Sequence, residues 1–292
     1  MLALLGAVCF STKAIFVKLA YRDTSIDSIT LLALRMVFSL PFFAGSAFVS
    51  SAKSSNVPFT RSQWLWVAFV GCLGYYVSSL LDFIGLQYVT AGLERLILFV
   101  YPTLVCLMSA VWFKVKINSI QWIALVITYA GLTTAFLSEA DLWSDQNENL
   151  MYGAVCIFIC AITYASYIVG SGKLIPIVGA SKFNSYAMSF ACIAVLAHYF
   201  VSGSVGELMN LPPMAYTYSF LMAVLGTVIP SYLVTGGMKR IGADNTAIIG
   251  SIGPVSTLLM AYWFLGESFS VGQLFGTALI LVGVTLIGKQ KS

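Results

Sequence analysis

The sequence predicts an all-α integral membrane protein with ten transmembrane helices, arranged as two inverted repeats of five helices each. Three observations lead to this prediction: the composition, the length of the apolar segments and a repeat within the chain. Hydrophobic residues make up 59% of the chain and charged residues only 9%, and the mean hydropathy is +0.92. Soluble proteins carry about 25% charged residues. With so few charges, the surface must face lipid over most of its perimeter.

Ten apolar segments are long enough to cross a bilayer, which takes about 20 helical residues. A strand of a membrane β-barrel needs only about 10 residues, so the length of these segments indicates helices. The first segment lacks a basic leader and is interrupted by Lys13 and Lys18, so we expect a retained helix rather than a cleaved signal peptide. The predicted helices are Leu2–Leu19, Ile29–Val49, Trp64–Leu81, Leu93–Phe113, Ile120–Leu137, Leu150–Val169, Phe183–Val201, Tyr216–Met238, Ala243–Leu265 and Val271–Ile287.

The distribution of basic residues predicts the orientation of these helices. Lysine and arginine concentrate in the even-numbered connections and at the C-terminus, whereas the odd-numbered connections are mainly acidic. Connections rich in basic residues stay in the cytoplasm. We therefore expect both termini on the cytoplasmic side of a bacterial inner membrane. The even-numbered connections hold Lys53, Arg61, Lys114, Lys116, Lys173, Lys182, Lys239 and Arg240.

An internal repeat divides the chain into two halves, which we place at residues 1–145 and 146–292. Pro102 and Pro254 lie 152 positions apart, and the same register aligns Gly131 with Gly283. Each half holds five helices, an odd number, so the second half must insert upside down relative to the first. Many secondary transporters have this architecture, with the substrate path between the halves near mid-membrane. Further matches are Leu73-Gly74 with Leu225-Gly226, Ser79 with Ser231, and Gly6–Cys9 with Gly153–Cys156.

A family resemblance follows from these motifs. The segments Ala91–Leu137 and Ala243–Gly288 resemble the paired repeats of the drug/metabolite transporter superfamily, and in particular its ten-helix EamA-type exporters. The resemblance implies export of small metabolites, often amino acids, from the bacterial cytoplasm. One departure, Lys114-Val115-Lys116 against Gly266-Glu267-Ser268, follows from the cytoplasmic side of the first connection. The matching features are Tyr101-Pro102, Gly253-Pro254, Leu265-Gly266-Glu267, Gln273, Gly276 and Gly283-Val284.

The same sequence argues against other functions. The net charge is only +4 and the basic residues are scattered, so we expect no nucleic-acid partner. There is no Walker sequence, no metal-ligand cluster and no Ser–His–Asp set. Cys156 and Cys160 share a helix face but lack further ligands, which favours packing. We expect neither enzymatic activity nor a cofactor or metal; the expected partners are a small-molecule substrate and the lipid bilayer.

Three prolines are candidates for shaping or gating the path. Pro102, Pro230 and Pro254 each remove a hydrogen bond within a helix. In lipid, the freed carbonyl must find another partner or line a wet cavity. The alternative is that these prolines are simply tolerated in the membrane.

Charges inside the membrane are scarce and therefore informative. Lys13 and Arg35 are embedded cations, and Asp82, Glu94 and Arg95 lie near helix ends. In a functional interpretation, Lys13 or Arg35 attracts a substrate carboxylate, and Glu94 or Asp82 exchanges a proton. In a structural interpretation, Arg35 or Arg95 pairs with Asp82 or Glu94.

Tyrosines well inside apolar segments are candidates for lining the path. A buried tyrosine hydroxyl requires a partner, and a tyrosine-lined cavity suits an amphipathic, uncharged or zwitterionic solute. The alternative is hydrogen bonding between helices. The candidate lining residues, together with Lys13, are Tyr75, Tyr76, Ser79, Tyr101, Tyr164, Tyr167 and Tyr232.

The sequence therefore leaves three functions to compare. The first is a secondary exporter of amino acids or similar small amphipathic metabolites, working by alternating access. The second is a nucleotide-sugar or organophosphate antiporter, which would call for several converging basic residues. The third is a membrane protein without transport activity, either an enzyme or a structural subunit.

Overall fold

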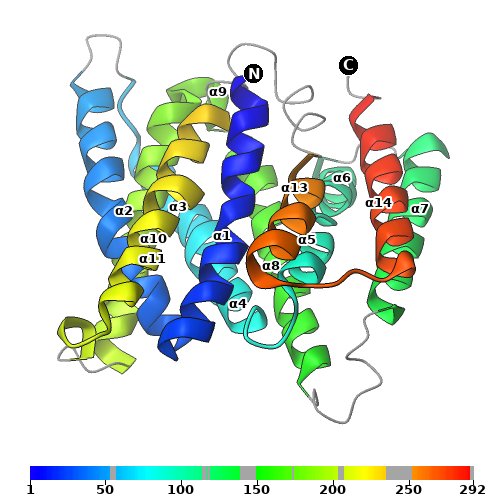
Figure 1. Cartoon of the computed structure of the whole chain (residues 1–292). Coiled ribbons are helices and arrows are strands. Elements are labelled where there is room, and N and C mark those ends of the chain that lie inside the picture. The colour runs from blue at the N-terminus through cyan, green and yellow to red at the C-terminus, as the bar shows by residue number, and fades with distance from the viewer. Residues whose placement is uncertain are drawn as a thin grey trace.

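The computed structural model describes residues 1–52, 57–113, 117, 119–138, 149–172, 174–202, 207–234 and 252–289. Within these residues the protein is a bundle of helices with no β-strand (Figure 1). The prediction of an all-α membrane protein is confirmed: eight of the helices are long and apolar enough to cross a membrane, and two shorter apolar helices follow them.

The first half begins with two uninterrupted helices, α1 (Leu2–Thr24) and α2 (Ser28–Ser51). The third membrane crossing runs through α3 (Arg61–Gly71), a π-helical segment η1 (Cys72–Val77) and α4 (Ser78–Gly85). The fourth consists of α5 (Ala91–Leu98) and α6 (Tyr101–Phe113), and the fifth is α7 (Ser119–Leu137).

The second half follows the same order. It begins with α8 (Leu150–Ser171), the short α9 (Ile175–Val178) and α10 (Ala180–Ser202). A 3₁₀ turn η3 (Glu207–Met209) leads to α11 (Pro213–Ala223), which continues through the π-helical η4 (Val224–Val228). The remaining elements are α13 (Ile252–Met260), the π-helical η5 (Ala261–Leu265) and α14 (Val271–Lys289).

The ends of several crossings differ from the predicted bounds. The third runs over Arg61–Gly85 rather than Trp64–Leu81, because Thr60 and Gln63 cap its start and extend the helix beyond the apolar residues. The ninth helix is described from Ile252, so the predicted start at Ala243 lies outside the described residues. The predicted end of the eighth helix at Met238 lies outside them as well.

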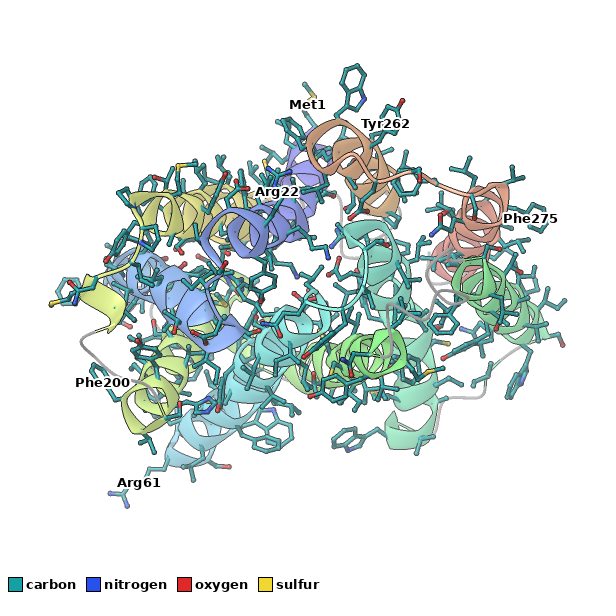
Figure 2. All side chains as sticks on the ribbon, turned by 60° about the horizontal axis from the view of Figure 1, so that its bottom comes forward. Met1, Arg22, Arg61, Phe200, Tyr262 and Phe275 are labelled. Carbon is teal, nitrogen blue, oxygen red and sulfur yellow. The ribbon has the colours of Figure 1, made fainter. Side chains whose placement is uncertain are left out.

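Lipid-facing side chains cover the perimeter of the bundle. Phe200, Tyr262 and Phe275 point outward in Figure 2, and each is about 60% exposed. Large apolar side chains are stable in that position only when hydrocarbon surrounds them. The perimeter thus agrees with the composition.

The two halves are interleaved. Helix α2 packs on α10, α4 on α8, and α1 on both α11 and α13. Helix α1 begins and α14 ends at the same end of the bundle (Figure 1), as an even number of crossings requires. A polar side chain in the middle of one half therefore lies close to helices of the other.

Both third helices of the halves contain a π-helical segment at equivalent positions. Adding the repeat offset of 152 to Cys72, the first residue of η1, gives Val224, the first residue of η4. In the second half, Pro230 is the second residue after this segment, so its missing N–H lies beside the altered hydrogen-bond pattern. The first half has Ser78 at that position, so the wide turn does not depend on proline.

The fourth crossing is interrupted before its proline. Helix α5 ends at Leu98 and α6 begins at Tyr101. The backbone N–H groups of Thr103 and Leu104 both donate to the carbonyl of Val100, at 3.0 and 3.2 Å. Pro102 is the second residue of α6, and a first helical turn needs no N–H from a proline there. Its repeat mate Pro254 lies in α13, which is described from Ile252.

Glycines let α7 and α14 approach closely at one side of the bundle (Figure 1). A Cβ atom on Gly131 would lie 2.7 Å from the carbonyl oxygen of Gly276, and one on Gly283 would lie 2.7 Å from that of Ala124. Close backbone approach through small residues is a common way for helices to associate in lipid. The repeat pair Gly131 and Gly283 thus lies in one helix–helix contact.

We expect Gly283→Leu to destabilise the fold, because the larger side chain must push α14 away from α7. Overpacking of this kind costs about 1–3 kcal/mol. The measurement is the thermal unfolding midpoint of the protein in detergent. Gly45→Leu is the matched control, since a Cβ atom there meets nothing within 4 Å. Equal midpoints for the two variants would contradict the close contact.

Candidate functional site

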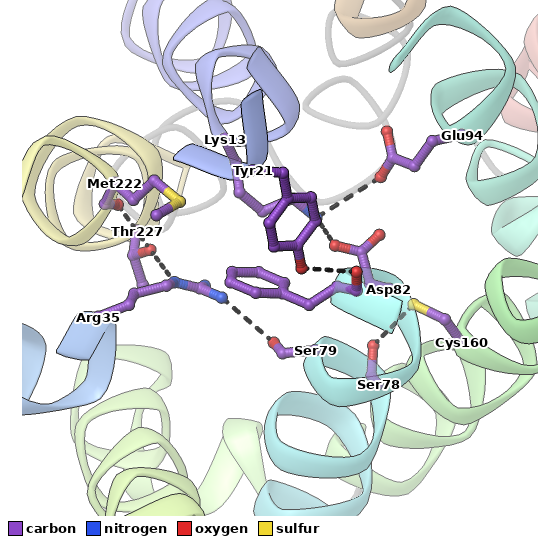
Figure 3. A network of polar contacts seen from close by, with 11 residues as sticks. Lys13, Tyr21, Arg35, Ser78, Ser79, Asp82, Glu94, Cys160, Met222 and Thr227 are labelled. Carbon is purple, nitrogen blue, oxygen red and sulfur yellow. Dashed lines mark hydrogen bonds and ion pairs between the residues drawn. The ribbon is translucent and has the colours of Figure 1, made fainter. Parts of the chain in front are cut away.

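A polar network lies inside the bundle, between helices of both halves (Figure 3). The first half contributes Lys13 from α1, Arg35 from α2, Asp82 from α4 and Glu94 from α5. The second half contributes Thr227 from η4, and Cys160 of α8, whose sulfur lies 3.2 Å from the Ser78 hydroxyl. Four of the five charged residues singled out in the sequence therefore converge.

The centre of the network is an ion pair between Lys13 and Asp82. The Lys13 Nζ lies 2.6 Å from Asp82 Oδ2 and 3.6 Å from Glu94 Oε1. The side chains of Asp82 and Glu94 are 1% and 0% exposed. Of the two interpretations of these carboxylates, the structural one named the wrong cation, because Lys13 rather than Arg35 or Arg95 pairs with them.

The two carboxylates keep unused hydrogen-bonding capacity. Within the described residues, Asp82 Oδ1 and both oxygens of Glu94 have no hydrogen-bond partner. Buried charged oxygens without donors are costly in a low-dielectric interior. One lysine therefore faces two buried carboxylates, an arrangement suited to binding or releasing a proton.

Arg35 lies beside this ion pair but contacts neutral groups. Its Nε donates to the hydroxyl of Thr227 at 2.9 Å, and one terminal nitrogen lies 3.5 Å from the Ser79 hydroxyl. The guanidinium carbon is 5.5 Å from the ring centroid of Phe83. No ion pair of Arg35 with a carboxylate is present in the described part of the chain.

Four of the predicted tyrosines form one cluster. The ring centroids of Tyr75 and Tyr167 are 4.8 Å apart, those of Tyr101 and Tyr164 are 5.2 Å apart, and those of Tyr164 and Tyr167 are 6.1 Å apart. The Tyr75 hydroxyl donates to Asn184 Oδ1 at 3.3 Å. The cluster, which we call the tyrosine cluster, joins the third and fourth crossings to α8.

The other two predicted tyrosines lie outside this cluster. The hydroxyl of Tyr76 is 3.0 Å from Nδ1 of His198 on α10, although His198 had received no role in the sequence analysis. Tyr232 stacks on Phe43, with ring centroids 6.2 Å apart. Tyr232 and Tyr75 pack against the same small apolar group of Phe43, Met188 and Val228.

Several polar contacts were not found from the sequence. The Tyr21 hydroxyl donates to the carbonyl of Phe83 at 2.7 Å. Glu267 accepts hydrogen bonds from the backbone N–H groups of Ala91 and Gly92, at 2.8 and 3.1 Å. It therefore caps α5 of the first half, although it belongs to the motif Leu265-Gly266-Glu267 of the second half. Only the folded chain shows these pairings, because their members are far apart in sequence.

A hollow of about 490 Å³ between α6 and α7 lies away from this network. Its lining residues, such as Leu107, Trp122 and Val126, are apolar. None of the predicted site residues lines it, so it adds nothing to the site.

A bundle of apolar membrane-crossing helices with a charged network between its halves defines a multi-pass membrane transport protein. The chain belongs to the EamA-like transporter family, whose model matches residues 1–137 and again residues 151–289. The family matches twice, so the chain carries two copies of one unit. The boundary at 145 and 146 and the opposite insertion of the halves remain predictions.

Two bacterial relatives are named as uncharacterized transporters. The chain is 33% identical to the "Uncharacterized transporter YcbK" of Bacillus subtilis (strain 168), with 97% of this chain and 90% of the relative covered. It is 24% identical to the "Uncharacterized transporter sll1319" of Synechocystis sp., with 100% and 93% covered. A structure described as "Crystal structure of protein" matches with a TM-score of 0.67 and 16% identity, covering 98% of this chain and 94% of its own, which shows the shared fold.

We expect Lys13→Met to destabilise the protein strongly, because it leaves Asp82 and Glu94 buried without their cation. Removing one partner of a buried ion pair costs about 3–5 kcal/mol. Adding Asp82→Asn should restore part of that loss. The measurement is a double-mutant cycle of unfolding midpoints in detergent.

Arg22→Gln is the control for this cycle, since the Arg22–Asp23 pair is 2.7 Å long but solvent-exposed and should change the midpoint little. Strictly additive effects of Lys13→Met and Asp82→Asn would contradict the pairing.

Proposed function

We propose that this protein exports amino acids or similar small amphipathic metabolites across the bacterial inner membrane by alternating access of its two halves. The observation that carries the proposal is the combination of a charged network and the tyrosine cluster at the interface of the halves. Such a site offers apolar ring faces, hydroxyls and a few charges together, which suits a solute with both polar and apolar parts.

In this function the tyrosine cluster binds the solute. Tyr75, Tyr101, Tyr164 and Tyr167 come from both halves, so relative movement of the halves changes the space between them. Pro102, Pro254 and Pro230, together with the π-helical segments, are the proposed points of bending. Tyr76 and Tyr232 support the cluster from its edges.

We assign Lys13, Asp82 and Glu94 to proton coupling. Lys13 was expected to bind substrate, but its ammonium group lies 2.6 Å from Asp82 and is thereby neutralised. A proton that binds to either carboxylate weakens the hold on Lys13, and the third crossing then loosens from α1. Secondary transport of this kind needs no cofactor or ATP.

The charge inventory of the site favours this function over an antiporter of nucleotide sugars or organophosphates. A phosphate group is held best by several converging basic side chains. In the described residues of the network, Lys13 is already paired with Asp82. Arg35, which has neutral partners, is then the one remaining cation of the described network for a phosphate. The third function, a membrane protein without transport activity, is disfavoured by the match to the EamA-like transporter family and by relatives that are named as uncharacterized transporters.

The orientation belongs to the same proposal. Both termini are placed in the cytoplasm, as the basic connections indicate. Glu267 and the start of α5 then lie on the external side.

Flux from proteoliposomes tests the function. We expect purified protein to release radiolabelled amino acids such as leucine or phenylalanine from loaded vesicles, faster than protein-free vesicles do. An imposed pH gradient should change the rate if the carboxylates exchange protons. Folded protein with no flux of any amino acid in the panel would contradict the proposal and direct attention to phosphorylated solutes.

We expect Glu94→Gln to abolish the response of flux to the pH gradient while exchange of labelled for unlabelled substrate continues, because exchange needs no net proton movement. Glu267→Gln makes the same chemical change outside the network and should retain the response. Flux of Glu94→Gln that still follows the gradient would remove Glu94 from the coupling step.

A further inference from the structure

Arg35 is a buried cation whose partners in the described part of the chain are neutral groups. Its side chain is 4% exposed, and its hydrogen bonds go to the hydroxyls of Thr227 and Ser79, at 2.9 and 3.5 Å. The ring of Phe83 covers it, with its centroid 5.5 Å from the guanidinium carbon. Hydroxyl dipoles and a ring face stabilise a cation but do not neutralise it.

Both carboxylates of the network face Lys13 rather than Arg35. The Lys13 Nζ lies 2.6 Å from Asp82 Oδ2 and 3.6 Å from Glu94 Oε1, and within the described residues no carboxylate forms an ion pair with Arg35. A buried arginine without an opposing carboxylate favours an anionic ligand.

The position of Arg35 places this anion site on the proposed transport path. Ser79 follows η1 in the first half, and Thr227 lies within η4 in the second, so the guanidinium lies between the two equivalent π-helical segments. Tyr75, a member of the tyrosine cluster, lies four residues before Ser79 on the same crossing and packs against the apolar group that contains Val228, the residue after Thr227. An anion at Arg35 would therefore extend its remaining atoms toward the tyrosine rings.

We propose that Arg35, framed by Ser79 and Thr227, binds the carboxylate group of the transported solute. The planar guanidinium matches a carboxylate in a two-point geometry that a lysine cannot reproduce. The two hydroxyls accept hydrogen bonds from the guanidinium and hold it in place when no solute is bound. The Ser79 hydroxyl can donate to the carboxylate when it enters, whereas the Thr227 hydroxyl donates to the carbonyl of Met222 at 3.0 Å and orients the guanidinium. This inference deepens the proposed function and rests on it, while its test does not require transport.

The test compares three probes with one carbon skeleton: leucine, isovalerate, which lacks the amine, and isoamylamine, which lacks the carboxylate. Binding is measured as the rise of the thermal unfolding midpoint of the full chain in detergent as each probe is titrated. Leucine and isovalerate should stabilise the wild-type protein, and isoamylamine should not. Arg35→Gln should weaken isovalerate binding at least about 10-fold, because a charge-assisted hydrogen bond is lost.

Further variants keep the result interpretable. Arg35→Lys retains the charge but not the planar fork and should bind isovalerate more weakly than wild type. The double variant Thr227→Val, Ser79→Ala retains the guanidinium but removes both hydroxyls beside it. It therefore tests the site by a second route if Arg35→Gln does not fold. Arg22→Gln, which alters an exposed arginine paired with Asp23, should bind as wild type does.

The outcomes separate the two proposals. Equal protection of wild type and Arg35→Gln by isovalerate would overturn the carboxylate site, as would protection by isoamylamine alone or no shift with either carboxylate probe. Isovalerate protection that depends on Arg35, in a protein without amino-acid flux, would retain the site and reject amino acids as the exported solutes.

Discussion

The ion pair between Lys13 and Asp82 is the interaction on which the interior of this protein depends. It joins α1 to α4 inside the bundle, where the side chains of Lys13 and Asp82 are only 15% and 1% exposed. Helix α1 also reaches the second half, where the Ser11 hydroxyl donates to the carbonyl of Gly253 at 3.0 Å. Two polar contacts thus fix the position of α1: Lys13 binds Asp82 of α4, and Ser11 binds Gly253 of α13. The other network residues lie around the ion pair.

The scarcity of water within a membrane explains why helices meet through glycine and why irregular turns recur. Apolar side chains gain little by leaving lipid for protein, so close backbone contacts and internal hydrogen bonds hold the bundle together. The contact of α7 with α14 is an example of close backbone packing. The segments η1 and η4 are examples of internal hydrogen bonding, since a wide turn changes which carbonyl groups have partners without exposing them to hydrocarbon.

Sequence reasoning recovered the elements but not their contacts. Hydropathy located the crossings but missed the start of the third at Arg61. A helix begins at its capping residues, here Thr60 and Gln63, and not at its first apolar residue. Sequence reasoning identified Lys13, Arg35, Asp82 and Glu94 as informative because embedded charges are rare. It left their roles open between two interpretations and did not consider a pair of Lys13 with Asp82, because these residues are 69 positions apart and their pairing follows from helix packing. The split between the tyrosine cluster and Tyr76 has the same origin, since adjacent residues on a helix point to different neighbours.

The charged network belongs almost entirely to one half of a duplicated chain. The offset that aligns Gly6–Cys9 with Gly153–Cys156 maps Lys13 onto Cys160, and the 152-residue offset maps Asp82 onto Val234 and Glu94 onto Thr246. A carrier made of two identical halves would have inward-open and outward-open states of equal energy. In this chain the buried charges Lys13, Arg35, Asp82 and Glu94 all lie on helices of the first half. Under the proposed alternating access, a membrane voltage would therefore act on the two halves unequally and favour one resting state over the other, while the direction of net flux would still follow the solute and proton gradients.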